Sequence, residues 1–291
     1  MKIRKAIFPA AGFGTRFLPV TKSQPKEMLP IVDKPVIQYL VEEAVASGIE
    51  EIIIVTGRGK RAIEDHFDFS YELEQTLVER GKRSLLAEVR KIPQMAKFVY
   101  VRQPFPLGDG DAIFQAAELI GDEPCAVMFG DDLVDSKVPA LKQLISIYEK
   151  YGAPVVALQR VEKKEVERYG IVECLPASKK STANSRLHHI KSLVEKPTPA
   201  KAPSNLAVIG KYIITPEIMQ ALQKVKKGRD GEIRLIDALK LIAGEHELLG
   251  YEIEGTRYDT GDKLGFLKAT IDYALKRKDL GPELRKHLKN L

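Results

Sequence analysis

The sequence is poor in cysteine: its 291 residues include two, Cys125 and Cys174, which lie far apart along the chain. Such a pair excludes a disulfide framework and a zinc site built from closely spaced cysteines. The sequence also lacks a run of about 18 apolar residues, the length that a membrane-spanning helix needs. We therefore expect no membrane partner and a reducing compartment, of which the cytoplasm is the simplest.

Several common functional motifs are missing as well. The five histidines are not spaced as metal ligands, and no G-x-S-x-G segment occurs, which excludes the nucleophile elbow of Ser-His-Asp hydrolases. Aromatic residues are not interleaved with a basic patch, so no nucleic-acid-binding motif is expected. Lys and Arg exceed Asp and Glu by 46 to 40, and this net charge of +6 allows a weak preference for anionic partners such as phosphates, nucleotides or nucleic acid.

What is present in the first half of the chain is an alternation of strand and helix signals. Short apolar or β-branched segments predict strands, and segments with helical spacing of apolar residues lie between them. The predicted strands are 3–8, 51–56, 98–102, 124–129 and 154–159, and the predicted helical regions are 33–48, 60–90, 112–120 and 141–151. This alternation predicts an α/β fold with a doubly wound sheet and right-handed crossovers.

The second half of the chain is richer in strand signals. Strands are predicted near 169–173, 190–195, 207–214 and 248–254, and a helix over 263–278 closes the chain. No segment has the composition of an interdomain linker, so we expect a single domain. Ligands of doubly wound sheets bind beyond the carboxyl ends of the strands, which predicts that the loops after Phe8, Arg102 and Phe129 converge on one site.

The loop after the first predicted strand has the sequence AAGFGTRFLP, residues 10–19. Two glycines one residue apart allow the backbone to approach a ligand and present N–H groups to it. The segment is not a dinucleotide fingerprint, because Phe17 replaces the third glycine, and it is not a P-loop, because no Gly-Lys-Ser/Thr follows. A plain turn is the simpler interpretation of a lone Gly-x-Gly, but Arg16, Lys22 and Lys26 in the same stretch favour a phosphate site.

Two further motifs stand at predicted strand ends. FGDD places Asp131 after a buried strand, where one or two carboxylates can hold Mg²⁺; a turn-capping role explains this motif alone equally well. VEKP places Glu195 beside Lys196, whose side chains would point to opposite faces of a regular strand. If both serve one ligand, the backbone must end or bend there, as Pro197 favours. An exposed ion pair is the simpler alternative.

These motifs together resemble the signature of the sugar-1-phosphate nucleotidylyltransferases, in particular the bacterial UTP–glucose-1-phosphate uridylyltransferases. AAGFGTRFLP is followed by SQPKEMLPIVDKP (23–35), RQPFPLGDG (102–110), FGDD (129–132), YGIVE (169–173), VEKP (194–197), APSNLAVIG (202–210) and YDTGDKLGFLKA (258–269). The resemblance implies a Rossmann-like mixed sheet of the nucleotide-diphospho-sugar transferase type. It also implies one domain over 1–291, with a nucleotide-binding half (1–160), a β-rich sugar-binding half (161–262) and a C-terminal helical segment (263–291).

The resemblance implies a role for each residue at a matching position. The residues implied to bind the nucleotide are Ala10, Ala11, Gly12, Gly14, Gln103 and Gly108, and those implied to bind the sugar are Gly170, Glu195 and Val208. The residues implied to be catalytic are Arg16, Lys26, Asp131 and Lys196, and those implied to hold Mg²⁺ are Asp131 and Asp259, although Asp259 has a simpler alternative as a turn residue. Such enzymes usually carry His where this chain has Asp111, and neither Asp109 nor Asp111 is assigned a role.

The implied reaction joins UTP and glucose 1-phosphate to give UDP-glucose and pyrophosphate, and relatives of this kind form homodimers or homotetramers. The alternatives are another sugar nucleotidylyltransferase such as a thymidylyltransferase, a non-catalytic nucleotide-sugar-binding regulatory protein, and a nucleic-acid-binding protein. A regulatory protein would be expected to lose Arg16, Lys26 or Asp131, and all three are present.

Overall fold

The computed structural model describes residues 2–176, 185–228 and 230–291. The strands are β1 (Lys5–Pro9), β2 (Pro30–Ile31), β3 (Lys34–Pro35), β4 (Glu51–Thr56), β5 (Lys97–Arg102), β6 (Cys125–Met128), β7 (Asp132–Asp135), β8 (Val155–Arg160), β9 (Gly170–Cys174), β10 (Leu187–Glu195), β11 (Leu206–Ile214), β12 (Leu249–Glu252) and β13 (Thr256–Asp259). The α-helices are α1 (Val36–Ala46), α2 (Arg61–Phe67), α3 (Tyr71–Glu79), α4 (Arg83–Lys91), α5 (Asp109–Phe114), α6 (Ala117–Ile120), α7 (Ala140–Tyr151), α8 (Pro216–Lys224), α9 (Leu235–Glu245), α10 (Lys263–Lys276) and α11 (Gly281–Lys289).

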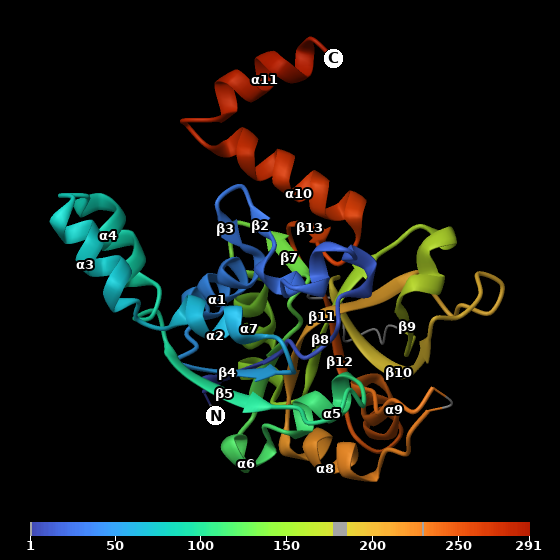
Figure 1. Ribbon diagram of the computed structural model, residues 1–291. Helices are drawn as coiled ribbons and strands as arrows, with labels where there is room; N and C mark the ends of the chain where they lie inside the picture. Colours follow the sequence, from blue (N-terminus) through green and yellow to red (C-terminus); the bar gives the residue numbers. More distant parts are fainter. Residues whose placement is uncertain (1, 177–184, 229) are drawn as a thin grey trace.

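Nine of the strands in the described part of the chain form one mixed sheet, in the order β5-β4-β1-β6-β11-β8-β12-β10-β9 (Figure 1). The first four strands are parallel, and their order is that of a Rossmann-type nucleotide-binding half. β11 runs antiparallel to both β6 and β8, so it joins the two halves of the chain in a single sheet. The predicted α/β fold with a doubly wound mixed sheet is confirmed.

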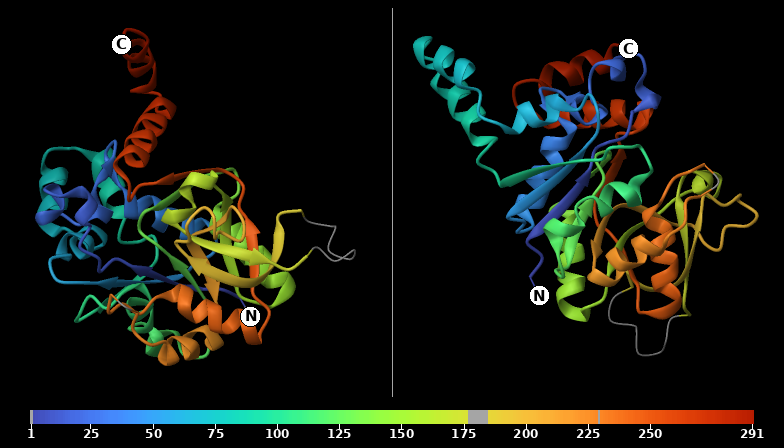
Figure 2. Two further views of the ribbon diagram at one scale, coloured as in Figure 1. Left: turned by 90° about the vertical axis from the view of Figure 1, so that its right-hand side faces the viewer. Right: turned by 60° about the horizontal axis from the view of Figure 1, so that its bottom comes forward.

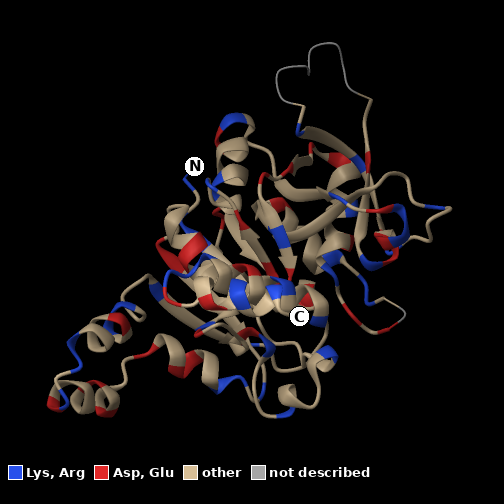
Figure 3. Cartoon of the chain, turned by 90° about the horizontal axis from the view of Figure 1, so that it is seen from above, with Lys and Arg blue, Asp and Glu red and all other residues tan. Residues whose placement is uncertain are grey.

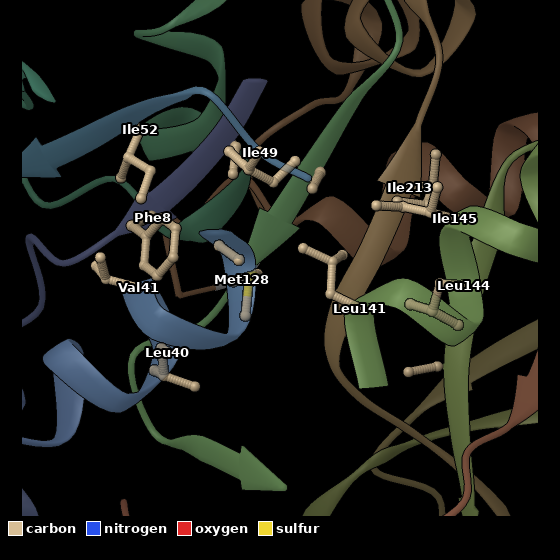
Figure 4. Close-up of a cluster of buried hydrophobic side chains, with 14 of the residues drawn as sticks. Phe8, Leu40, Val41, Ile49, Ile52, Met128, Leu141, Leu144, Ile145 and Ile213 are labelled. Carbon is tan, nitrogen blue, oxygen red and sulfur yellow. The ribbon is translucent and has the colours of Figure 1, made fainter. Parts of the chain in front are cut away.

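Helices cover both faces of this sheet, which explains the uninterrupted apolar strands. Phe8 and Ile52 face the side covered by α1 and α7, where they pack with Leu40 in one buried cluster (Figure 4). Their neighbours in sequence, Ile7 and Ile53, point to the opposite side and pack against α5, α8 and α9. Full burial of each such side chain stabilises the fold by about 1.5–3 kcal/mol, which fixes the positions of the strand ends.

Three sequence predictions differ from the structure at helices. The helical region predicted over 60–90 is divided into α2 and a hairpin of α3 and α4, whose turn contains Gly81 at φ 63°. That hairpin projects from the body of the molecule (Figures 1 and 2), and neither helix has a buried residue. The helix predicted over 112–120 begins earlier and is divided into α5 and α6. The prediction that one helix closes the chain is wrong, because α11 follows α10 and begins at the helix-starting pair Gly281 and Pro282.

Basic and acidic residues are interspersed over the molecule when it is viewed from above (Figure 3). The basic residues near the chain's end are partly paired, since Arg277 lies 2.6 Å from carboxylate oxygens of both Asp33 and Asp279. None of the helices formed by the described residues combines the length and the apolar character that a membrane crossing requires.

Candidate active site

Two adjoining cavities lie beyond the carboxyl ends of β1, β5 and β6. The first, of about 390 Å³, is lined by Gly12, Gln103 and Phe129 from the loops after these strands, and we call it the loop cavity. The second, of about 520 Å³, extends toward Gly170 and Glu195 in the second half of the chain, and we call it the sheet cavity. The predicted convergence of the three loops is therefore confirmed. Among the described residues, those that line both cavities are Arg16, Asp109, Phe129 and Glu232.

The glycine loop after β1 presents open backbone to the loop cavity. Ala11 and Gly12 line the cavity, and a Cβ atom added to Gly12 would meet no atom within 4 Å. Ala10 is buried, and its N–H donates to the carbonyl of Val55 at 2.9 Å, which extends the pairing of β1 with β4. Gly14 has a left-handed φ of 65° and packs against the side-chain stem of Lys26. It therefore provides the turn in the loop and does not line the cavity.

Lys26 and Asp131 form an ion pair at the edge of the loop cavity, with Nζ 2.6 Å from Oδ2. Burial alone would lower the pKa of Lys26, but the Asp131 carboxylate outweighs that effect and the pKa is raised. Burial alone would raise the pKa of Asp131, but Lys26 lowers it overall. Both groups are therefore charged at neutral pH.

Buried polar contacts hold the strand end that carries Asp131. One oxygen of the Asp132 carboxylate pairs with Arg257, and the other accepts a hydrogen bond from the Gly210 N–H at 2.8 Å. Glu27 is 1% exposed and pairs with Lys60 at 2.9 Å. Asp132 is thus bonded within the protein through both oxygens, whereas Asp131 pairs with Lys26 through Oδ2 and lines the sheet cavity.

Asp259 lies on β13 and faces the sheet cavity together with Asp131. Its Oδ1 accepts a hydrogen bond from the Gly261 N–H at 3.1 Å, and its Oδ2 lies 3.2 Å from a guanidinium nitrogen of Arg168. Burial, together with the charge of Asp132, raises the pKa of Asp259.

Asp131 and Asp259 are candidate ligands for a metal ion. Across the described ranges, no group of three or more His, Cys, Asp and Glu side chains forms a complete metal site. Two carboxylates on one cavity nevertheless fit Mg²⁺, which commonly takes one or two carboxylates and completes its coordination with water and phosphate oxygens. Asp131 and Asp259 are the donors of this kind that the motifs single out.

The backbone bends at the VEKP motif, as the sequence predicts. β10 ends at Glu195, and Lys196 has a φ of 45°, in the left-handed region that non-glycine residues rarely adopt. The Lys196 N–H donates to the Tyr169 carbonyl at 3.0 Å, which holds the bend. Both side chains line the sheet cavity, with Nζ of Lys196 3.4 Å from Oε1 of Glu195. Gly170 and Val208 line the same cavity.

Gln103 and Gly108 stand at the other end of the site and line the loop cavity. Gln103 is 6% exposed, and its side-chain amide donates to the Gly108 carbonyl at 3.0 Å and to Oδ2 of Asp111 at 2.7 Å. Asp109 accepts a hydrogen bond from the Leu235 N–H at 2.9 Å, and burial raises its pKa to about 6. Both aspartates of this segment are therefore hydrogen-bonded within the protein.

The residues given a role by the motifs line the two cavities, except Ala10 and Gly14, which shape the glycine loop. Lys22, the third cation of the glycine-loop stretch, lines neither cavity. The motifs did not single out Asp109, Arg168, Tyr212 or Arg257, which also line the sheet cavity. Arg257 carries a weak signal, because it stands two positions before Asp259 and shares its face on β13, a strand that the sequence analysis does not predict. Asp109 carries another, as a charge inside a glycine-rich segment.

Comparisons with known proteins agree with the motifs. Residues 5–276 match the family described as Nucleotidyl transferase. The chain is 50% identical over 283 residues to UTP–glucose-1-phosphate uridylyltransferase of Bacillus subtilis (strain 168), which covers 97% of this chain and 95% of that protein. It is 51% identical over 290 residues to UTP–glucose-1-phosphate uridylyltransferase 2 of Staphylococcus saprophyticus, which covers 100% of this chain and 98% of that protein.

Solved structures show the same fold. A UDP-glucose pyrophosphorylase complexed with UDP-glucose is 45% identical, with a TM-score of 0.85, over 94% of this chain and 100% of that chain. The UTP-bound enzyme from Acinetobacter baumannii is 39% identical, with a TM-score of 0.91, over 99% of both chains. The chain therefore belongs to the nucleotidyl transferase family, as its motifs indicated.

Proposed function

We propose that this protein transfers the uridylyl group of UTP to glucose 1-phosphate, giving UDP-glucose and pyrophosphate. The observation that carries the proposal is the pair of adjoining cavities that meet at Arg16. The loop cavity offers the backbone and the cations that suit a nucleoside triphosphate, and the sheet cavity offers the Glu195–Lys196 pair that suits a sugar phosphate. The relatives named for this reaction match along almost the whole chain.

The reaction needs no covalent enzyme intermediate. A phosphate oxygen of glucose 1-phosphate attacks the α-phosphorus of UTP and forms one P–O bond, while the bond from that phosphorus to the pyrophosphate oxygen breaks on the opposite side. The attacking oxygen is already an anion, so no base has to remove a proton from it. The difficulty lies in bringing two polyanions together, and the protein contributes position and positive charge.

The residues singled out by the motifs have separate parts in this proposal. Arg16 and Lys26 bind the pyrophosphate group that leaves, and Lys196 guides the attacking phosphate. Glu195 accepts hydrogen bonds from sugar hydroxyls, while the Gly170 N–H donates to the sugar. Val208 packs against the sugar. The uridine is bound by Ala11, Gly12, Gln103 and Gly108. Ala10 and Gly14 shape the loop that presents these groups.

Enzymes of the nucleotidyl transferase family generally use a divalent metal ion. We propose that here it is Mg²⁺ and that Asp131 and Asp259 hold it. The ion, when bound, neutralises charge on the phosphates. Asp131 and Asp259 would hold the ion, and Lys26 and Arg168, which pair with these carboxylates, would supply positive charge to phosphate oxygens.

The proposed organisation has three parts: residues 1–160 bind the nucleotide, residues 161–262 bind the sugar, and residues 263–291 form a helical segment. Leu264, Leu267 and Ile271 are exposed on α10, which suits an interface in a homodimer or homotetramer. We also propose that the protein works in the cytoplasm, where Cys125 and Cys174, both free, stay reduced. Light scattering of the purified protein tests the oligomeric state.

Release of pyrophosphate tests the reaction. The purified protein is mixed with Mg²⁺, glucose 1-phosphate and each nucleoside triphosphate in turn, and we expect release with UTP. Faster release with dTTP than with UTP would indicate a thymidylyltransferase, and no release with any nucleotide would indicate a regulatory protein. Asp131→Ala should abolish release while its circular dichroism spectrum matches that of the wild type.

A further inference from the structure

The side chain of Gln103 is held on one side by two groups that can only accept hydrogen bonds. One is the backbone carbonyl of Gly108, at 3.0 Å from the amide nitrogen, and the other is the carboxylate of Asp111, at 2.7 Å. An amide has two N–H donors on its nitrogen and two acceptor sites on its oxygen. Because both neighbours are acceptors, the nitrogen must face them, and both of its hydrogens are taken.

The carbonyl oxygen of Gln103 consequently faces the other way. Gln103 lines the loop cavity, and no donor from a described residue reaches its Oε1. Among the described side chains, the buried oxygens without a hydrogen-bond partner are Glu27 Oε1 and Glu43 Oε2. The Gln103 oxygen is not one of them, so it is accessible from the cavity. Gln103 therefore presents a hydrogen-bond acceptor, and no donor, to the loop cavity.

Asp111 contributes more than Gly108 to this orientation. Its bond to the amide is the shorter of the two and involves a charge, and charge-assisted hydrogen bonds are about twice as strong as neutral ones. Asp111 is itself fixed on α5, and its other oxygen has a weak contact with Gln115, at 3.5 Å. Without the carboxylate, one hydrogen of the Gln103 amide would lose its partner.

We propose that Asp111 is a specificity-determining residue, which positions Gln103 so that the loop cavity accepts a base with a ring N–H and rejects one without. Uracil and thymine carry a hydrogen on N3 and can donate it to the Gln103 oxygen. Cytosine has an unprotonated N3 at the same place, where two acceptors would face each other. This inference rests on the proposed function, since it takes the loop cavity as the site of the base.

The test compares kcat/KM for UTP, CTP and dTTP in the wild type, Asp111→Ala and Asp111→Ser. Loss of the charged hydrogen bond should lower the UTP-to-CTP ratio of kcat/KM by about tenfold or more, because the amide can then turn and donate to cytosine. The UTP-to-dTTP ratio should stay unchanged, because both bases carry the N3 hydrogen. Gln115→Ala, which removes the weak contact on the other oxygen of Asp111, is the matched control and should leave both ratios unchanged.

The outcomes separate the inference from the proposed function. If the wild type does not release pyrophosphate with any of the nucleotides, the proposed function fails. If the wild type prefers UTP and a folded Asp111 variant keeps the UTP-to-CTP ratio, the inference is overturned and the function stands. If both ratios change together, Asp111 has a general structural role and the inference is also overturned. Two small substitutions are included so that one folded variant is available.

Discussion

The ion pair between Lys26 and Asp131 supports both the fold and the proposed reaction, and a double-mutant cycle separates these two contributions. Lys26→Met leaves the Asp131 carboxylate without its partner at 2.6 Å, and Asp131→Asn leaves the ammonium group without its own. The double variant removes both charges together. The two side chains are uncharged near-isosteres of the originals, so packing changes little.

The exposure of the pair sets the expected magnitude. The side chains of Lys26 and Asp131 are 22% and 19% exposed, so the pair is largely but not fully buried. Breaking a fully buried pair costs about 3–5 kcal/mol and an exposed pair contributes about 0–1 kcal/mol. We expect each single variant to lose about 2 kcal/mol of the free energy of unfolding. The double variant should lose no more than either single variant, because it leaves no unpaired charge.

Urea unfolding at pH 7 and fixed salt measures the stability, and pyrophosphate release measures the activity. The double variant should be no less stable than either single variant, while its activity stays absent because the phosphate ligand and the metal ligand are both gone. The pKa of Asp131 is lowered on folding, so its stabilising effect is present above the usual Asp pKa of about 3.9 and is lost as the pH falls through the folded value. Losses that add within about 0.5 kcal/mol would refute the coupling.

Three other substitutions or treatments give further predictions. Burial raises the pKa of Asp109 to about 6, so stability should fall as the pH rises from about 4 to about 6. Asp109→Asn should remove up to about 3 kcal/mol of that fall, seen as a smaller difference in Tm between pH 4 and pH 7. Lys196→Gly should relieve about 1 kcal/mol of left-handed backbone strain and raise Tm, whereas Lys196→Ala should leave the strain in place and not raise Tm. Both variants should raise KM for glucose 1-phosphate, because both lack the cation. EDTA should stop pyrophosphate release, Mg²⁺ should restore it, and Asp259→Asn should raise the half-saturating Mg²⁺ concentration by at least about tenfold; an unchanged value would contradict its role as a ligand.

Strands buried on both faces were predictable because their pattern is local. The prediction over 51–56 coincides with β4, since the four side chains from Ile52 to Val55 pack alternately into the buried clusters on the two faces of the sheet. β7 and β13 were not predicted, because each has four residues and exists through its pairing with the other, which lies far away in the sequence. The start of α11 depends on the Gly281–Pro282 pair, which reads equally well as the end of a helical segment.

The candidate site shows the same division. Motif residues such as Gln103 and Lys196 were identified because their spacing is distinctive. Asp109 and Arg168 were not, because a charged residue in a loop usually faces solvent, and their actual positions depend on tertiary partners. The Asp109 carboxylate accepts a hydrogen bond from the first N–H of α9, more than 120 residues later in the chain. Arg168 pairs with Asp259.

The central place of β11 has a consequence for how such a chain can be altered. β11 hydrogen-bonds to β6 on one side and β8 on the other, and its Lys211, which is fully buried, pairs with Glu43 of α1 at 3.0 Å. A fragment that ends at residue 160 would leave the edge of β6 open and the Glu43 carboxylate without its cation, Lys211. The two halves are therefore not exchangeable modules. A new preference for base or sugar has to arise by substitutions around the cavities, within one continuous sheet.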